Sequence, residues 1–361
     1  MRQLTWCTEL TAAFGEARTQ HKLLFVLFAC PRAKNAALIL RPGNSALARL
    51  LTEHFVPVHL ASLKDIDLNL FRFDYDQQLM GLVLTPEGNT LARWGGDDIS
   101  VASVSALLSF LERVKRLERS GPKPKAPHTL AQKFPSFAQT KRAQEACYHC
   151  HYAHDAEIEQ QRRTGTFQKL SLYRYPPPSV LGLTLGEDNQ ITAIAPGSPA
   201  AKSGLKVGER LTQLDKQPLI TAADLSFALD ALPESARSVS LNGKRLTLAS
   251  GWRAYDISRR PSQGIVPPLF GFWEEPIPGS KTLALKVTLL FSGERWRASQ
   301  GDLRLGDVIV AVDGKLLPQM SASQFHTWLR MNKDVGQKVA LTVVRDGKRL
   351  VLTLPCLDIV F

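Results

Sequence analysis

Hydrophobic and polar positions in the first 120 residues follow two different periods, which predicts a mixed α/β fold. Apolar residues three and four positions apart indicate amphipathic helices, and short continuous apolar runs indicate buried strands. The turn Pro86-Glu87-Gly88-Asn89 between two apolar runs indicates a hairpin. The pattern predicts helix, strand, helix, strand, hairpin and helix, in that order, at residues 7–21, 22–29, 44–55, 56–61, 79–96 and 101–120.

The second half of the chain contains one pattern twice. Each copy has a glycine-containing turn, a strand, a helix, and a hairpin closed by Asn-Gly or Asp-Gly. The copies match at Gly208 with Gly306, at Asp215 with Asp313, and at residues 242–246 with 346–350. We therefore expect two mainly-β domains, at 171–255 and 256–361, which we call the first repeat and the second repeat.

Both repeats resemble bacterial PDZ domains, most specifically in the stretches SPAAKSGLKVG and LRLGDVIVAVDGK. The resemblance implies capture of an extended peptide or a protein C-terminus by strand addition, with a glycine-containing loop offering backbone N–H groups to the carboxylate. It places the two grooves at Leu181, Gly182, Leu183, Leu185, Leu225 and Leu229, and at Leu269, Phe270, Gly271, Phe272, Phe325 and Leu329. The stretch WEEPIPGSK separates the second loop from the next strand, which leaves a displaced or blocked groove as the alternative there.

Composition is that of a soluble globular protein, with 44% hydrophobic and 22% charged residues. No apolar run reaches the roughly 18–20 residues that span a bilayer. The formal net charge is +12, and much of the basic excess lies in the middle of the chain. No nucleic-acid-binding motif accompanies it, so we interpret it as a solvated connector. The Pro/Lys stretch 121–128 is a linker that cannot continue a helix.

The order of elements in residues 1–120 resembles a thioredoxin-like domain. Trp6, the strand at 23–29, and the PEGNT hairpin followed by Gly95 and Gly96 carry this resemblance. Thioredoxin chemistry needs two thiols, one to attack and one to resolve the mixed disulfide.

Only one thiol lies near the expected place. Cys30 precedes it, and Ala33 and Ala36 stand where the pair belongs. We therefore expect no dithiol–disulfide exchange. Cys30 is a weak candidate for a peroxidatic or sensing thiol, against the alternative of a buried structural cysteine.

The stretch Cys147-Tyr148-His149-Cys150-His151 matches C-x-x-C-H, the attachment motif of c-type haem. The two thiols add to the two vinyl groups of the porphyrin, and His151, one helical turn from the first thiol, becomes the proximal iron ligand. His128 on the linker is the preferred distal ligand, and Met80 is also far enough away in sequence. We expect this polar segment, residues 129–170, to lack a core of its own and to be ordered only with haem.

Two alternatives to haem stay open. Zinc would use Cys147 and Cys150 with two of His149, His151 and His154, although four ligands so close in sequence are strained. The segment also fits a chain that binds no cofactor.

The expected fold class is multidomain: a thioredoxin-like domain without CxxC at 1–120, a linker with a helical haem-binding segment at 121–170, and two PDZ domains. This arrangement resembles a family of bacterial thioredoxin-like/PDZ proteins, some of which carry selenocysteine in the first domain; GWRAYDIS is among the stretches most like it. The resemblance names no substrate.

We expect a periplasmic c-type haem protein, a redox carrier or sensor coupled to binding of a protein partner. Thioether formation needs exported apoprotein, so we expect a leader that this sequence lacks; if the start is native, the protein is cytoplasmic. The alternatives are a non-catalytic PDZ scaffold without cofactor, and a thiol peroxidase or reductase based on Cys30. Nucleic acid is not an expected partner, and no oligomeric state is indicated.

Overall fold

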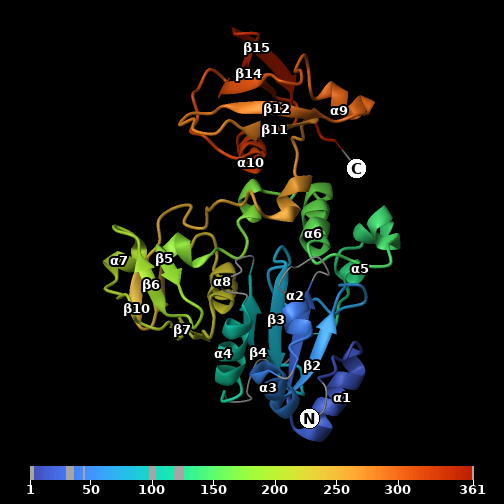
Figure 1. The fold of residues 1–361 in the computed structure, drawn as a ribbon, viewed down its shortest axis with the longest axis vertical. Coiled ribbons are helices and arrows are strands. Elements are labelled where there is room, and N and C mark those ends of the chain that lie inside the picture. The colour runs from blue at the N-terminus through green and yellow to red at the C-terminus, as the bar shows by residue number, and fades with distance from the viewer. Residues whose placement is uncertain (1–3, 30–35, 44, 97–102, 118–125, 360–361) are drawn as a thin grey trace. The chain divides into compact units, whose positions relative to one another are not determined.

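The computed structural model describes residues 4–29, 36–43, 45–96, 103–117 and 126–359. The chain divides into two compact units, Met1–Tyr255 and Asp256–Phe361 (Figure 1). Unit 1 holds the N-terminal α/β region, the connector and the first repeat, and unit 2 holds the second repeat. Each unit is described by itself.

The N-terminal region is built on a four-stranded sheet with the order β2-β1-β3-β4. The central strand β1 pairs parallel to β2 and antiparallel to β3, and β4 is antiparallel to β3. The strands span Leu23–Ala29, Phe55–Leu60, Leu79–Leu84 and Thr90–Gly95 for β1 to β4. The predicted strands and hairpin are confirmed.

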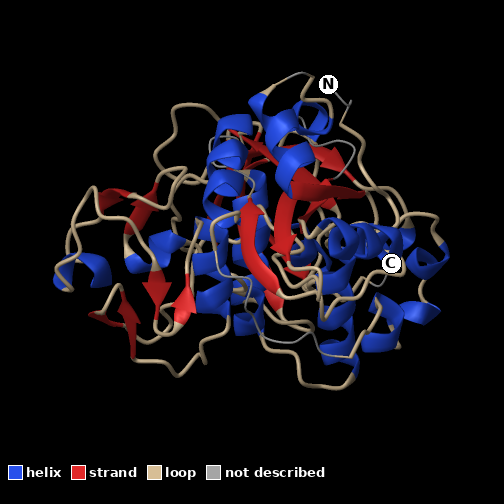
Figure 2. Ribbon diagram, turned by 90° about the horizontal axis from the view of Figure 1, so that it is seen from below, coloured by secondary structure: helices blue, strands red, loops and turns tan. Residues whose placement is uncertain are grey.

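Helices cover both faces of this sheet (Figure 2). Alternate residues of β1 face opposite sides, so Leu24, Val26 and Phe28 join one core cluster while Leu23 and Phe25 join the other. The helices are α1 on the first face and α2, α3 and α4 on the second, at Leu10–Gln20, Ala36–Leu40, Ala46–His54 and Val104–Val114. Three of these were predicted, and α2 was not.

The connector, residues 126–170, packs on the first face of the sheet. It forms α5 (Leu130–Lys133), two short 3₁₀ turns at 137–139 and 141–144, and α6 (Tyr152–Arg163). Its apolar side chains share one buried cluster with α1, β1 and the loop 61–78; they are Leu130, Phe134, Phe137, Tyr148, Tyr152, Ala153 and Ala156. The segment has no separate core and shares that of the N-terminal region, and the expected dependence of its order on haem stays a prediction.

Two further 3₁₀ turns, at 169–172 and 178–181, precede the first strand of the first repeat. It has a two-stranded sheet, β5-β6, and a four-stranded sheet, β10-β9-β7-β8. The strands β5 to β10 span Leu183–Leu185, Ile191–Ile194, Gln213–Leu214, Gln217–Pro218, Ser238–Leu241 and Lys244–Thr247. The helices are α7 (Pro199–Lys202) and α8 (Ala222–Asp230).

The second repeat has one five-stranded sheet in sequential order, β11-β12-β13-β14-β15. The strands span Phe272–Pro276, Leu285–Leu290, Val308–Val312, Lys338–Arg345 and Lys348–Pro355. A 3₁₀ turn at Pro261–Ile265 precedes them, and the helices are α9 (Glu294–Ala298) and α10 (Ala322–Asn332).

Corresponding positions of the repeats adopt the same backbone conformation. Asp215 and Asp313 have φ of 49° and 48°, in the left-handed region. The Asp215 carboxylate accepts the Ser240 N–H at 2.9 Å, and that of Asp313 accepts the Ala340 N–H at 3.0 Å. An aspartate tolerates this conformation when its side chain bonds nearby backbone, so the sequence match predicted a shared turn.

Candidate functional site

The two thiols of the C-x-x-C-H stretch lie in a loop on the surface of unit 1. Cys147 is exposed, Cys150 is half-buried, and neither forms a disulfide. The loop is attached to the end of β2, since the Tyr148 N–H donates to Ser62 Oγ at 2.8 Å and the Leu63 N–H donates to the Tyr148 carbonyl at 2.9 Å. The stretch was predicted to be helical, but α6 begins only at Tyr152.

His151 stands at the N-cap of α6, where a buried carboxylate orients its ring. Asp155, 3% exposed, has Oδ2 3.1 Å from His151 Nδ1, and Arg142 also bonds this oxygen. A hydrogen bond donated by Nδ1 fixes the tautomer and leaves Nε2 as the nitrogen able to bind a metal. Next to it, burial and then the hydrogen bond to Glu145 raise the pKa of Tyr152 to about 12.

The other predicted haem and thiol residues are placed elsewhere. His128 is exposed, and its Nδ1 lies 3.1 Å from Asn69 Nδ2 while its N–H donates to Asp67. Met80 is buried in β3, within the core. His149 is exposed. Cys30 lies outside the described residues. No contact joins His128 to the C-x-x-C-H loop among those described, so its role as distal ligand stays a prediction.

His154, a possible zinc ligand with the thiols, is instead buried against two carboxylates. Its Nε2 lies 3.3 Å from Asp74 Oδ1. Within the described ranges, Asp74, Asp76 and His154 form the one group of three metal-ligating side chains whose ligand atoms lie within 4.8 Å of one another. Sequence analysis missed this cluster because its members are far apart along the chain.

In the first repeat, the predicted groove residues surround the open edge of β5. Among the described strands, β5 pairs only with β6, which leaves its other edge free. The residues Leu181, Leu183, Leu225 and Leu229 are at most 2% exposed, and Leu185 is partly exposed. All five belong to one apolar cluster that includes β5 and α8. The structure thus brings these five predicted residues together, and four of them are buried.

Gly182 makes the turn into β5. Its φ of 80° lies in the left-handed region, and a Cβ there would come within 2.1 Å of Ser198 Cβ. Its carbonyl accepts the Ala195 N–H at 2.8 Å. Gly271 occupies the corresponding place in the second repeat, where its carbonyl accepts the Phe291 N–H at 2.8 Å.

In the second repeat, side chains fill the space between β11 and α10. Glu274 on β11 is fully buried, and its Oε2 lies 3.1 Å from Nε2 of His326 on α10. Trp273 stacks on the His326 ring at a centroid distance of 5.4 Å. Nearby, burial lowers the pKa of Arg330 to about 10, against the opposing effect of Glu274.

The predicted residues of this second groove are therefore covered. Leu269, Phe270, Phe272, Phe325 and Leu329 are at most 3% exposed, and the Gly271 N–H already donates to Ser299 Oγ at 2.8 Å. The stretch WEEPIPGSK does not displace the strand, because its first four residues belong to β11 itself. The Glu274–His326 pair lies between β11 and α10, the elements that carry most of these predicted groove residues.

A buried polar contact that sequence analysis missed joins α8 to β4. Asp224 Oδ1 accepts the Arg93 N–H at 2.9 Å and lies 3.7 Å from Arg93 Nη1. The Arg93 guanidinium lies 3.4 Å from the Phe227 ring centroid, a cation–π contact. Burial raises the pKa of Asp224 to about 6, although Arg93 and three backbone N–H groups oppose the rise.

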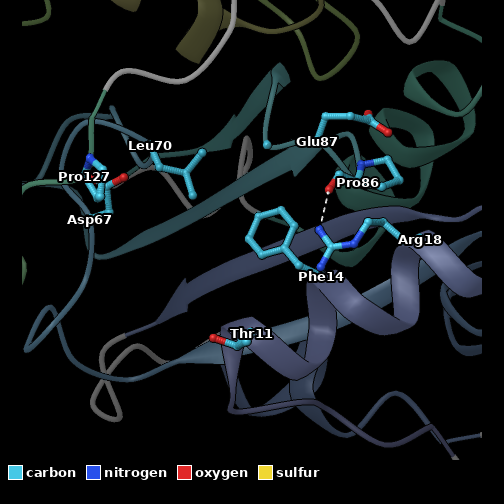
Figure 3. Close-up of a pocket in the computed structure, with 9 residues that line it drawn as sticks. Thr11, Phe14, Arg18, Asp67, Leu70, Pro86, Glu87 and Pro127 are labelled. Atoms are coloured by element: carbon cyan, nitrogen blue, oxygen red, sulfur yellow. Dashed lines mark hydrogen bonds between the residues drawn. The ribbon is translucent and has the colours of Figure 1, made fainter.

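A shallow surface pocket lies between α1 and the turn joining β3 to β4 (Figure 3). Arg18 crosses it, and its Nη1 donates to the Pro86 carbonyl at 3.3 Å. Phe14 and Leu70 supply apolar walls, and Asp67 and Glu87 stand at the rim. The lining residues include no cysteine, histidine or serine.

Comparison with known proteins identifies both repeats. Family models described as the PDZ domain match residues 190–242 and 297–355. The chain therefore contains two PDZ domains, which bind peptides and protein C-termini. The matched spans include α8 and α10, whereas the loops at 181–185 and 269–272 precede them.

Solved structures give a weaker likeness. One is the HtrA-type protease AlgW with a decapeptide, at 18% identity and a TM-score of 0.21, over 32% of this chain and 37% of that one. A substituted form of AlgW, also with a decapeptide, shares 20% identity at a TM-score of 0.21, over 25% of this chain and 28% of that one. The chain thus spans well under half of either protease chain. No curated protein matches it.

The described part of the chain contains no helix with the length and apolar character that a membrane-spanning segment requires.

Proposed function

We propose that this protein acts outside the cytoplasm, binds protein C-termini through its first PDZ domain, and carries a c-type haem on the loop before α6. The observation that carries the binding role is the free edge of β5 beside the Gly182 turn. A bound haem would make the protein a redox carrier or sensor attached to its partner.

The backbone of β5 supports strand addition. The Ala195 N–H donates to the Gly182 carbonyl, and Leu183 is opposite Ile194 in the antiparallel register. Hydrogen-bonded and non-hydrogen-bonded pairs alternate in such a ladder, so the N–H and C=O of Leu183 face away from β6. An extended peptide would bond to these two groups and place its carboxylate near Gly182.

We assign binding to the first PDZ domain rather than the second. Leu185 is partly exposed beside the free edge, so a peptide side chain can reach the apolar cluster. In the second domain, Glu274 on β11 and His326 on α10 form a buried hydrogen bond between the two elements that carry the groove residues. A peptide entering there would have to break a buried hydrogen bond, which is costly.

Binding can be tested on the full-length chain. A displayed library of random peptides with free C-termini would supply one strong binder, synthesised as the free acid and as the amide. We expect the amide to bind at least about 10-fold more weakly, since hydrogen bonds to a charged group contribute roughly 1.5–3 kcal/mol. Isothermal titration calorimetry would measure both. Equal affinities would contradict capture of a carboxylate.

Matched glycine variants locate the binding domain. Gly182→Ala should abolish binding of the free acid, and Gly271→Ala should leave it unchanged, although both place a Cβ against close neighbours. The reverse result would assign the peptide to the second PDZ domain.

The haem proposal is favoured by the chemistry of the loop. Cys147 and Cys150 form no disulfide, one is exposed and one half-buried, and His151 has its Nδ1 held by Asp155. These residues fit the group: two thiols for thioether bonds and one imidazole nitrogen for the iron. The haem supplies one-electron chemistry when attached. Asp155 positions the His151 ring, with Arg142 holding the carboxylate in place.

An absorption spectrum tests this proposal. Full-length protein exported together with the cytochrome maturation machinery should show a Soret band that survives acid–acetone extraction. The Cys147→Ser/Cys150→Ser variant should lose the extraction-resistant band, and Cys7→Ser, at another half-buried thiol, should keep it. Wild-type protein without such a band would leave a PDZ scaffold without cofactor, the second candidate.

We further propose a thioredoxin-like fold for the N-terminal region. The mixed sheet with order β2-β1-β3-β4 and helices on both faces supports it. A thiol peroxidase or reductase based on Cys30 is a third candidate, which trapping a sulfenic acid at that residue would support. Export is proposed because thioether attachment takes place outside the cytoplasm.

A further inference from the structure

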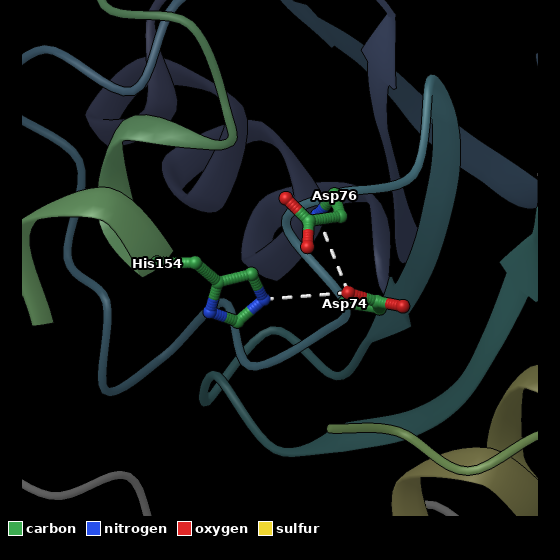
Figure 4. Close-up of side chains that lie close together, drawn as sticks. All are labelled: Asp74, Asp76 and His154. Carbon is green, nitrogen blue, oxygen red and sulfur yellow. Dashed lines mark hydrogen bonds and ion pairs between the residues drawn. The ribbon is translucent and has the colours of Figure 1, made fainter. Parts of the chain in front are cut away.

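We propose that Asp74, Asp76 and His154 bind one divalent first-row transition-metal ion inside unit 1. One ligand atom from each lies within 4.8 Å of the other two, and all three side chains are buried. Figure 4 shows the imidazole, carried by α6, directed at the two carboxylates of the loop that precedes β3. The proposal does not depend on haem or on peptide binding.

The three candidate ligands are almost completely buried. Asp74 is 6% exposed, Asp76 is 4% exposed and His154 is 2% exposed. Carboxylates are rarely buried unless they are paired or bind a metal, because removing a charge from water is costly. An ion held by both carboxylates and the imidazole would offset this cost, in addition to the His154–Asp74 contact.

A fourth oxygen lies beside the cluster. Gln77 donates from Nε2 to Asp74 Oδ2 at 3.1 Å, and its Oε1 is buried without a hydrogen-bond partner. Buried polar atoms nearly always have a partner, so one without any indicates a ligand or water that completes it. The amide could become a ligand or bond to a metal-bound water.

The donor set selects the metal. Carboxylate oxygens with an imidazole nitrogen suit Zn²⁺, Mn²⁺, Fe²⁺ or Co²⁺, whereas Mg²⁺ and Ca²⁺ prefer oxygen alone. The set contains no sulfur, which distinguishes this site from zinc bound by Cys147 and Cys150.

A metal here would fix α6 to the loop of the N-terminal region. His154 follows the predicted haem ligand His151 by three residues on the same segment, and its ring also contacts Tyr75. The ion would therefore set the position of the helix that carries His151, as a structural site.

The test uses the full-length chain, stripped with a chelator and then titrated with Zn²⁺ or Co²⁺. We expect one ion per chain, and a Co²⁺ spectrum with ligand-field bands and no thiolate charge-transfer band. His154→Ala should weaken Zn²⁺ binding at least about 100-fold, beyond the 10–100-fold that changes around a metal site cause. Asp76→Asn, nearly the same in shape, should weaken it similarly and keep the fold.

The control is Cys147→Ser/Cys150→Ser, which should bind Zn²⁺ as the wild type does. Circular dichroism of the stripped proteins would verify that each variant is folded. Retention of binding in Asp76→Asn with its loss in the cysteine variant would assign the metal to the thiols and overturn the proposal. Absence of a stoichiometric ion in the wild type would also overturn it.

Discussion

Replacing Asp224 by alanine should lower the free energy of opening of α8 by about 4 kcal/mol, since breaking a buried ion pair costs about 3–5 kcal/mol. The carboxylate accepts N–H groups from Arg93, Ile220 and Thr221, and it lies beside the Arg93 guanidinium. Alanine would leave these groups buried without an acceptor. Hydrogen exchange of the α8 amides in the full-length chain would measure the loss.

A surface ion pair of the same PDZ domain provides the control. Asp188 pairs with Arg210, and both are partly exposed. Asp188→Ala should cost at most about 1 kcal/mol, the usual limit for such pairs. Equal losses of stability in the two variants would show that the buried α8–β4 contact stabilises the domain no more than an exposed ion pair does.

The raised pKa of the Asp224 carboxylate predicts that the stability of the first PDZ domain falls as the pH rises. Burial raises the native pKa of Asp224 from 3.8 to about 6. Between these values the native state keeps a proton that the unfolded state has released. The stability that Asp224 contributes is therefore fully present below about pH 4 and is lost as the pH rises through about 6, by roughly 3 kcal/mol.

Comparison with Asp224→Asn isolates this contribution, because asparagine does not titrate. The stability difference, wild type minus Asn, should fall between pH 4 and pH 7. A difference that grows with pH would mean that attraction to Arg93 outweighs the burial of the carboxylate.

Gly182→Ala should destabilise the first PDZ domain by about 3 kcal/mol. The left-handed conformation costs an L-residue about 1–2 kcal/mol, and forcing a methyl against Ser198 adds about 1–3 kcal/mol. Gly197 has a φ of 72° with open space around its Cβ position, so Gly197→Ala should cost only about 1 kcal/mol. Denaturant unfolding of both variants measures the contrast.

A double-mutant cycle separates the cost of the left-handed backbone conformation at residue 182 from the cost of the steric clash with Ser198. Ser198→Gly removes the atoms that an alanine at 182 would meet, so Gly182→Ala should cost less in that background. An unchanged cost would attribute the whole effect to backbone conformation. Since Gly182 is also the proposed carboxylate position, the cycle shows how much of any lost peptide binding reflects lost folding.

Local sequence patterns predicted most elements of the chain. The apolar run 23–29 became β1, and the hairpin around Gly88 became β3 and β4. The repeat of turn residues predicted matched turns at Asp215 and Asp313, because both depend on the conformation of single residues and their own side chains. The spacing of C-x-x-C-H was visible as well, although the expected helix starts after it.

The packing of the connector could have been inferred from its apolar spacing. Leu130, Phe134 and Phe137 lie four and three residues apart, as on one face of a helix. Sequence analysis treated this segment as polar and did not use this spacing. Its burial against the N-terminal sheet removes the reason for expecting it to be ordered by haem alone.

By itself the sequence determined the local elements, the two PDZ repeats and the thiol–imidazole motif, since each depends on residues close along the chain. Only the tertiary structure decided that His154 meets Asp74, that Asp224 meets Arg93, and that Glu274 meets His326. Such pairs depend on which faces of distant elements pack together. A buried polar group takes its partner from whatever that packing brings within hydrogen-bond distance, and no periodicity along the chain records the choice.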